Sequence, residues 1–234
     1  MELKINNLVK RFGDKTALEI AELNIAKGTL LGLVGNNGAG KTTLFRLILD
    51  LLKANSGTVL SKEIEVSKSE NWKIYTGAFI DNRFLIDFLT PDEYFYFVGR
   101  TYGMSRDAVK ESLLTFTRFM SDEILNQKKY IRNFSAGNKQ KIGIVAAMMV
   151  RPEILILDEP FNYLDPSSQI EIRNLIAQTN NENETTVLIS SHNLNHTTEI
   201  SKRIILLEKG LIKMDIINTP DSIAELNNYF AEQI

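Results

Sequence analysis

The sequence predicts an α/β fold, in which a mostly parallel sheet is flanked by helices and interrupted by a helical insertion. Two continuous apolar runs, Leu30–Val34 and Ile154–Leu157, are typical of strands buried in a parallel sheet. Helical spacing follows the first run from Lys41 to Leu52 and dominates residues 84–150. The order strand, helix, helical insert, strand, helix, strand indicates an α/β core with a helical subdomain inserted in its middle.

The composition is that of an ordinary globular protein. The chain has 234 residues, of which 44% are hydrophobic and 24% charged. Lys and Arg number 27 and Asp and Glu 29, which gives a net charge of −2 and argues against a nucleic-acid partner. The absence of cysteine excludes a disulfide scaffold, a thiolate zinc site and a cysteine nucleophile. No apolar run approaches the roughly 20 residues that cross a bilayer, and we expect no secretion signal.

The other elements are predicted from short apolar pieces and helix-start signals. Apolar residues alternate in Leu3–Ile5 and in Leu23–Ile25, which indicates strands before the first continuous run. Thr90–Glu93 reads as a capping box with Pro at the first helical position. Later signals are helix starts at Asp165-Pro166 and Thr219-Pro220, a helix from Pro166 to about Ala177, strands Thr186–Ser190 and Arg203–Glu208, and a hairpin turn at Lys209-Gly210 into Leu211–Ile216.

The segment between the first apolar strand and the helix after it fits the pattern G-x-x-x-x-G-K-[ST]. Its glycines let backbone N–H groups turn inward around phosphates, and the following helix directs the positive end of its dipole at them. We expect Lys41 to reach the β- and γ-phosphates, Thr42 to bind Mg²⁺ and Thr43 to touch the α-phosphate. A glycine-rich turn without a ligand is the alternative. The expected ATP-binding residues are Gly35, Asn36, Asn37, Gly38, Ala39, Gly40, Lys41, Thr42 and Thr43.

Two carboxylates, Asp158 and Glu159, follow the second apolar run. In P-loop ATPases an Asp at such a strand end helps to hold Mg²⁺. Glu159 is then placed to polarise a water molecule against the γ-phosphate, because one carboxylate cannot serve both roles. An ordinary charged turn after a core strand is the alternative. Together with the phosphate loop, the pair predicts a P-loop NTPase core that binds ATP and Mg²⁺.

Four further segments resemble those of the ATP-binding cassette (ABC) family, the ATPase subunits of membrane transporters, and the resemblance covers nearly the whole chain. Phe134–Asn138, about 20 residues before the acidic pair, is similar to the family signature L-S-G-G-Q. Phe161–Pro166 resembles the loop after the acidic pair, and Ile189–His192 resembles the strand end that carries the switch histidine. Phe12 stands where the family places an aromatic that stacks on adenine.

The resemblance implies a head-to-tail dimer, expected to be a homodimer, in which the signature of one subunit meets the ATP of the other. A transmembrane permease subunit would be the other partner, and the chain would then lie in the cytoplasm on the inner face of the cell membrane. The implied roles are signature contacts for Ser135, Ala136, Gly137 and Asn138, dimer-loop contacts for Leu164 and Asp165, and catalysis for Glu159, His192 and Lys41.

The resemblance also implies that residues 1–234 form one ABC ATPase domain. Residues 1–80 and 150–234 would form the ATP-binding core, which includes an antiparallel β subdomain, and residues 81–149 would form a helical signature subdomain. Asp81 stands where the family usually has Gln, and it is a third candidate for Mg²⁺ binding beside Thr42 and Asp158. Ala136 and Asn138 also depart from the usual signature.

The start of the helical segment is rich in aromatic residues. Some of them must belong to the core of the helical subdomain, and as a group they suit a groove that receives a short helix of the membrane subunit, as in the family. The residues are Phe84, Phe88, Tyr94, Phe95, Tyr96, Phe97 and Tyr102.

These motifs favour the ATPase subunit of a membrane transporter, and Thr90–Gly103 resembles the subgroup that serves exporters. A soluble ABC ATPase that drives assembly or remodelling of a protein complex shares every motif and stays an alternative. A nucleotide kinase would share the phosphate loop but would not need the signature or the acidic pair. His196, four residues after the switch histidine, is expected at the surface.

Overall fold

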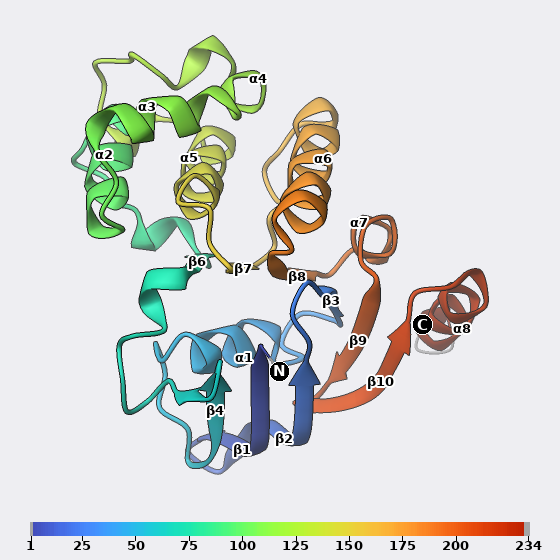
Figure 1. The fold of residues 1–234 in the computed structure, drawn as a ribbon. Helices are drawn as coiled ribbons and strands as arrows, with labels where there is room; N and C mark the ends of the chain where they lie inside the picture. Colours follow the sequence, from blue (N-terminus) through green and yellow to red (C-terminus); the bar gives the residue numbers. More distant parts are fainter. Residues whose placement is uncertain (1, 232–234) are drawn as a thin grey trace.

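The computed structural model describes residues 2–231, whose strands form two sheets (Figure 1). The larger sheet contains, in spatial order, β10 (Leu211–Ile217), β9 (Arg203–Glu208), β3 (Leu30–Val34), β8 (Thr186–Ser191), β7 (Ile154–Leu157) and β6 (Thr76–Phe79). Neighbouring strands from β9 to β6 are parallel, and β10 runs antiparallel to β9. The carboxyl ends of β3, β8 and β7 therefore meet at one edge of the sheet.

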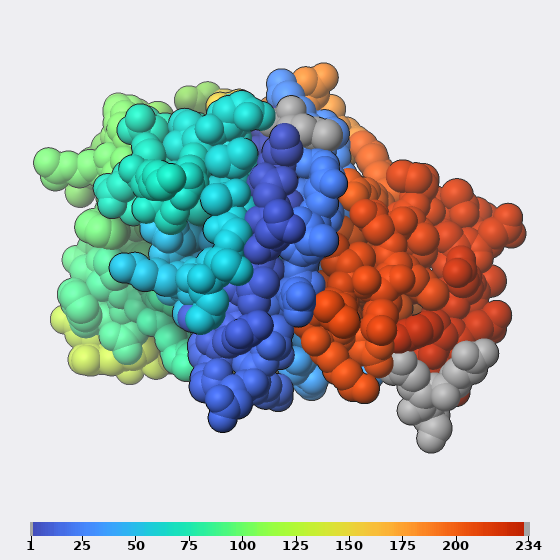
Figure 2. Space-filling model, turned by 90° about the horizontal axis from the view of Figure 1, so that it is seen from below, coloured from blue at the N-terminus to red at the C-terminus, as the bar shows by residue number. Residues whose placement is uncertain are grey.

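The second sheet is antiparallel and contains β2 (Lys15–Ile25), β1 (Leu3–Phe12), β4 (Ser56–Ser61) and β5 (Ile64–Glu65), in that spatial order. Figure 2 shows the β1–β2 hairpin, in blue, between the cyan β4 region and the orange C-terminal strands. The two sheets meet where the backbone N–H of Glu19 donates to the carbonyl of Gly210, at 2.8 Å, in the turn between β9 and β10.

Helices lie beside the strands of both sheets, and all elements between β6 and β7 are helices or 3₁₀ turns (Figure 1). The α-helices within residues 2–231 are α1 (Lys41–Ile48), α2 (Pro91–Thr101), α3 (Arg106–Leu114), α4 (Thr117–Met120), α5 (Ala136–Met148), α6 (Pro166–Asn183), α7 (Leu194–Thr198) and α8 (Pro220–Ala231). Short 3₁₀ turns lie at Lys73–Tyr75, Asn82–Phe84, Ser121–Glu123 and Ile131–Asn133. Among these described residues, no helix combines the length and apolarity needed to cross a bilayer.

Alternate residues of the central strands face two separate cores. Leu155 and Leu157 of β7 belong to the core that includes the side chains of α5 and α6. Ile154 and Ile156 face the other way, into the core that contains Leu44 of α1 and the inner face of the antiparallel sheet. Both faces of the parallel sheet are thus covered, which explains the continuous apolar runs in the sequence. The predicted α/β fold, with a mostly parallel sheet and helices inserted before β7, is confirmed.

The element boundaries follow the predicted local signals closely where those signals are strong. The Thr90–Glu93 capping box is formed at the start of α2, and the Asp165 side chain caps α6. β7 spans the predicted four residues. α1 ends at Ile48 rather than at Leu52, because the chain leaves the helix at Asp50, whose φ of +50° lies in the left-handed region.

Four elements differ more from the expectation. The hairpin strands β1 and β2 are much longer than the predicted apolar pieces. One face of each strand is exposed to solvent, so the strands continue through polar residues that show no continuous apolar run. Helix α6 continues to Asn183, six residues beyond the predicted end. The five-residue helix α7 was not predicted.

Candidate nucleotide site

The phosphate loop connects β3 to α1 and passes very close to β9. Gly35 has φ +151°, and a Cβ atom there would lie only 2.2 Å from the carbonyl oxygen of Leu207. Only glycine allows this approach without moving the backbone of β9. The loop is further fixed by a hydrogen bond at 2.8 Å from the N–H of Gly210 to the carbonyl of Ala39. The β9–β10 turn therefore supports the loop from outside.

The ammonium group of Lys41 lies inside this loop. The side chain is 6% exposed, and Nζ donates to the carbonyl of Gly35 at 2.6 Å and to that of Asn36 at 3.4 Å. The same Nζ lies 3.6 Å from Oε1 of Glu159. Within residues 2–231, the partners of this buried ammonium are two carbonyls and one carboxylate, so the group is positioned to bind an anion at this place.

Asp158 lies at the carboxyl end of β7 and is held from two sides. Oγ1 of Thr42 donates to its Oδ2 at 2.5 Å, and Oγ of Ser190, on β8, donates to its Oδ1. Burial raises the pKa of the Asp158 carboxyl, while the two hydroxyl donors and nearby Lys41 act in the opposite direction. The structure thus brings together Thr42 and Asp158, two of the three oxygen donors that were predicted for Mg²⁺.

Glu159 has a left-handed backbone, with φ +48°. This conformation is held by Ser190, whose Oγ accepts a hydrogen bond at 2.8 Å from the N–H of Glu159, and by Gln140 of α5, whose side-chain amide donates at 3.0 Å to the carbonyl of Glu159. Its Oε2 lies 2.8 Å from Nδ1 of His192 and accepts from the N–H of His192 at 3.3 Å. The structure therefore joins Glu159, Lys41 and His192 in one cluster.

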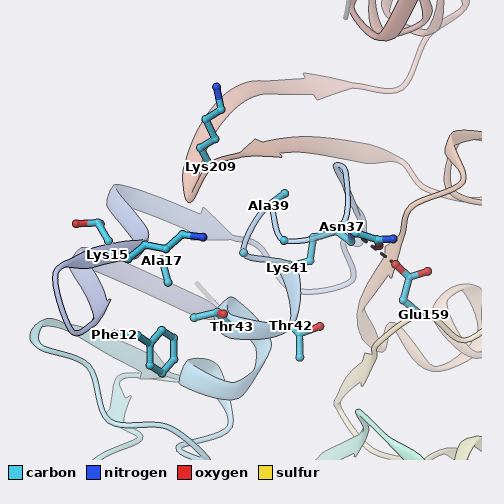
Figure 3. A pocket seen from close by; sticks show the side chains of 13 residues that line it. Phe12, Lys15, Ala17, Asn37, Ala39, Lys41, Thr42, Thr43, Glu159 and Lys209 are labelled. Carbon is cyan, nitrogen blue, oxygen red and sulfur yellow. Dashed lines mark ion pairs between the residues drawn. The ribbon is translucent and has the colours of Figure 1, made fainter. Parts of the chain in front are cut away.

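A cavity of about 370 Å³ runs along the phosphate loop, and Figure 3 shows Phe12 toward one end and Glu159 at the other. Phe12 is half-exposed, and Nζ of Lys10 lies 4.9 Å from the centre of its ring. A triphosphate along the loop would leave the base near this aromatic ring. The lining residues are Phe12, Lys15, Thr16, Ala17, Asn37, Gly38, Ala39, Gly40, Lys41, Thr42, Thr43, Glu159 and Lys209.

Two lysines that line this cavity, Lys15 and Lys209, were missed by the sequence analysis. Lys15 begins β2 immediately after the turn that follows Phe12, and Lys209 lies in the predicted hairpin turn before Gly210. The turn was visible in the sequence, but no local signal indicates that it contacts the phosphate loop. Both positive charges lie where they attract a polyphosphate.

The signature residues lie outside this cavity in the single chain. The Ser135 side chain caps α5 by accepting from the N–H of Asn138 at 3.2 Å, and Ser135 and Ala136 are exposed. A Cβ atom at Gly137 would lie 2.6 Å from the carbonyl oxygen of Tyr163, so the loop after the acidic pair closely approaches this turn. Leu164 in that loop is buried, and Asp165 caps α6 through Ser167 and Ser168.

Asp81 does not line the cavity. Its side chain accepts from the backbone N–H of Arg83 and binds the Arg83 guanidinium through Oδ2, at 2.9 Å from Nε and 2.6 Å from Nη2. These contacts hold the pKa of the Asp81 carboxyl below its usual range. The structure thus gives Asp81 a capping role at Asn82–Phe84.

His196, which was expected at the surface, is only partly exposed there, and its Nδ1 atom is buried. The imidazole is half-buried and stacks on the ring of Phe161, with centroids 4.7 Å apart and an angle of 27° between the planes. Burial lowers the pKa of His196, and the nearby charges of Arg173 and His192 act in the same direction. No local sequence signal predicts this contact, because the two rings are 35 residues apart.

The aromatic residues of the helical segment divide into core and surface. Phe95 is fully buried, whereas Phe84, Phe88 and Phe97 are exposed, with fractions of 54%, 64% and 49%. A groove of about 290 Å³ lies between β6, α2 and α5 and is lined by Phe84, Tyr94 and Tyr102 together with aliphatic side chains. Burial raises the pKa of Tyr94 to about 12.

Comparison with known proteins agrees with this arrangement. The family model described as ABC transporter matches residues 18–162, which include the phosphate loop, the signature and the acidic pair. The chain belongs to the ABC transporter family. As a member of this ATP-binding family, the protein is an ATPase. The match also includes both sides of the site, because the loop after β3 and the pair after β7 lie within it.

The relatives of this ABC protein are ATP-binding subunits of transporters. The uncharacterized ABC transporter ATP-binding protein YhaQ of Bacillus subtilis is 35% identical over 89% of this chain and 68% of its own length. The bacitracin transport ATP-binding protein BcrA of Enterococcus faecalis is 34% identical over 89% of this chain and 67% of its own length. The lantibiotic transport ATP-binding protein SrtF of Streptococcus pyogenes is 32% identical and covers 99% of this chain and 97% of its own length.

Solved structures of ABC cassettes share the fold. The dimeric structure of a bacterial ABC transporter cassette superimposes with a TM-score of 0.83 over 93% of this chain and 99% of the other, at 24% identity. A structure described as the ATP-binding subunit of an ABC transporter gives a TM-score of 0.85 over 97% of this chain and 94% of the other, at 23% identity.

Proposed function

We propose that this chain binds and hydrolyses ATP as a subunit of a membrane transporter, with the triphosphate in the cavity along the phosphate loop. The observation that carries the proposal is the convergence of Lys41, Thr42, Asp158, Glu159 and His192 at the carboxyl ends of β3, β7 and β8. Open α/β sheets bind ligands at this edge.

The roles proposed for the chain's own residues follow from these contacts. Lys41 would exchange its carbonyl and carboxylate partners for phosphate oxygens and so stabilise negative charge. Glu159 would orient and deprotonate the attacking water molecule. His192 would hold the Glu159 carboxylate through the contact at 2.8 Å and meet the γ-phosphate. Phe12 would stack on the base.

We propose that Thr42 and Asp158 hold Mg²⁺ together with the phosphates of ATP. The donor set fits this ion, because Mg²⁺ is usually bound by one or two carboxylates, a hydroxyl or waters, and substrate phosphates. Among the described residues, no group of three acidic or histidine side chains could hold a metal ion without the nucleotide. An Mg²⁺ ion that is bound through substrate phosphates needs only one or two carboxylates from the protein. When bound, the ion neutralises charge on the phosphates. The contacts between Asp81 and Arg83 argue for a structural role of Asp81, although it stays a candidate.

We propose that the second half of each ATP site comes from another copy of the chain. Ser135 and Ala136 are exposed at the N-terminus of α5, a position suited to an anion, yet they lie outside the cavity of their own chain. Head-to-tail pairing would bring this turn, with Gly137 and Asn138 and the loop at Leu164 and Asp165, to the partner's phosphates. Residues 81–149 would act as the signature subdomain and residues 1–80 and 150–234 as the ATP-binding core.

We propose that the groove beside Phe84 and Tyr94 receives a helix of a transmembrane permease, which would hold the chain at the inner face of the cell membrane. Apolar and aromatic lining suits an amphipathic helix. We further propose export as the direction, which is supported by the resemblance of Thr90–Gly103 to exporter subunits. The relatives named for transport of bacitracin and lantibiotics are compatible with it, whereas another relative is named for sulfate import.

The decisive experiment for hydrolysis is Glu159→Gln, with Glu111→Gln, at an exposed position of α3, as the matched control. Glu159→Gln should slow ATP hydrolysis by at least about a hundredfold, because it removes the general base, and should leave an ATP-bound dimer visible by size-exclusion chromatography. Glu111→Gln should behave as the parent. Hydrolysis at the parental rate in Glu159→Gln would refute the assignment.

The transporter role is tested by affinity purification of the tagged chain from detergent-solubilised membranes of its native host. A stoichiometric multi-span protein supports the proposal, and its loss on substitution of Phe84 by Glu, with Ile74→Glu as an exposed control outside the groove, supports the docking site. A soluble stoichiometric partner without a membrane protein would favour the assembly ATPase instead. Export predicts that cells expressing only Glu159→Gln retain more of the cargo.

A further inference from the structure

Helix α7 follows His192 directly and is wedged between two parts of the site. On one side Thr197 is fully buried against β3, so close that a Cβ atom at Gly32 would lie 2.1 Å from Cγ2 of Thr197. Gly32 lies on the strand that enters the phosphate loop. The helix also contacts β8, which carries Ser190. α7 is therefore docked on the sheet immediately beside the phosphate loop.

On its other side α7 contacts the loop that follows the acidic pair. The His196 ring stacks on Phe161, which is 3% exposed and lies two residues after Glu159. The same two segments thus meet twice: Glu159 contacts His192, and Phe161 contacts His196. The stack of His196 on Phe161 holds the two segments at a fixed distance. The contact between His192 and Glu159 has no comparable packing around it, because His192 is half-exposed.

The His196 ring acts through packing rather than through charge or hydrogen bonding. Its Nδ1 atom is buried and has no hydrogen-bond partner among the described residues. Of the charged groups that act on the ring, Arg173 is paired with Glu199, and His192 and Glu159 contact each other. Burial holds the pKa of His196 below its usual value, so the ring is neutral at pH 7 and above.

We infer that His196 is a positioning residue, whose ring against Phe161 holds α7 so that His192 stays in contact with Glu159. This inference rests on the proposed function, because it assigns the effect of His196 to the hydrolytic pair. His196 does not line the nucleotide cavity, so its loss should affect the chemical step and leave ATP binding unchanged.

The test compares His196→Ala with His196→Phe, which keeps the ring and removes the unpaired nitrogen. Asn195→Ala, at an exposed position of α7, is the matched control. His196→Ala should lower kcat for ATP about three- to tenfold with KM unchanged, a range that matches the contribution of one aromatic pair. His196→Phe should restore the parental kcat, and Asn195→Ala should retain it. In a His192→Ala background, His196→Ala should cause no further loss.

Three results would overturn the inference. The first is a parental kcat in His196→Ala, and the second is a kcat in His196→Phe as low as in His196→Ala. The third is that His196→Ala lowers kcat by the same factor in the His192→Ala background as in the parent. His196→Phe also guards against misfolding, because a ring of similar size preserves the packing. Failure of the proposed function is seen separately, as a parental rate in His192→Ala and in Glu159→Gln.

Discussion

Replacement of Ser190 by Ala tests how the acidic pair is held. Ser190 is fully buried on β8, and its single hydroxyl donates to Oδ1 of Asp158 while it accepts from the N–H of Glu159 at 2.8 Å. Alanine at this position removes both hydrogen bonds, so the Asp158 carboxylate loses a donor and the N–H of Glu159 loses its acceptor. Ser191 is equally buried, but its hydroxyl only accepts from the N–H of Asn193, at 3.0 Å, which makes Ser191→Ala a matched control.

The expected magnitudes differ clearly between the two serines. A hydrogen bond to a carboxylate contributes about 1.5–3 kcal/mol, and a buried N–H left without a partner costs about 1–3 kcal/mol. Ser190→Ala should therefore lower the free energy of unfolding by about 3–5 kcal/mol at pH 7.5. Ser191→Ala should lower it by about 1 kcal/mol, because one neutral hydrogen bond is lost. Since Glu159 loses its backbone anchor, kcat should fall more in Ser190→Ala than in Ser191→Ala.

The effect of Ser190→Ala should also depend on pH. The Ser190 donor lowers the pKa of Asp158, which burial raises, so its removal raises this pKa further. An acid whose pKa is raised by folding destabilises the fold as pH rises through the unfolded and then the folded pKa. The difference between mutant and parent should thus be larger at pH 7.5 than at pH 5 in urea unfolding. Equal losses for the two serines, or a loss that shrinks with rising pH, would refute this reasoning.

Three further changes separate binding from stability. Gly35→Ala should abolish binding of a fluorescent ATP analogue and destabilise by at least about 3 kcal/mol, because its Cβ would meet Leu207, whereas Gly38→Ala, which has open space, should cost about 1 kcal/mol in thermal unfolding. Phe12→Ala should weaken ATP binding about fivefold to a hundredfold in titrations, with a nearly unchanged unfolding midpoint, since the ring is half-exposed. Asp165→Ala should lower the unfolding midpoint by about 2–4 °C at pH 7, because α6 loses its cap. The serine donors depress the pKa of Asp165, so its stabilisation is present above the unfolded pKa and fades as pH falls. The difference in midpoint between mutant and parent should therefore become smaller below about pH 4. Asp165→Asn should keep the cap and lose this pH dependence, and a pH-independent deficit in Asp165→Ala would contradict the argument.

The parts of the fold that sequence predicts well are those fixed by local chemistry. β7 was predicted residue for residue, because its four apolar side chains are bounded by a proline-containing turn before and two carboxylates after. The helix starts at Pro91 and Pro166 carry caps that need no tertiary contact. The length of β1 and β2 could not be predicted, since pairing with each other and with β4 extends the strands through polar residues.

The same division applies to the site. The phosphate loop and the acidic pair are contiguous in sequence, and the structure joins Lys41, Thr42, Asp158 and Glu159 as the motifs suggested. Lys15 and Lys209 reach the cavity only because a turn of each sheet folds over the loop. The two hydrogen bonds of Ser190 depend on the order of the strands in the sheet, which is not visible in the sequence. The stack of His196 on Phe161 depends on α7, a helix of five residues that is too short to give a periodic signal.

Strand order also explains why different parts of the site should fail in different ways. β8 lies between β3 and β7, so Ser190 and Asp158 are fixed by the hydrogen-bonded register of the sheet, in which Leu157 faces Ile189 and Val34 faces Ser191. His192 lies beyond the end of β8, and its position depends on α7 and on its contact with Glu159. Phe12 and Lys15 come from the other sheet. Changes at the sheet edge should therefore cost stability, changes on the antiparallel sheet should cost nucleotide affinity, and changes around α7 should slow hydrolysis while binding persists.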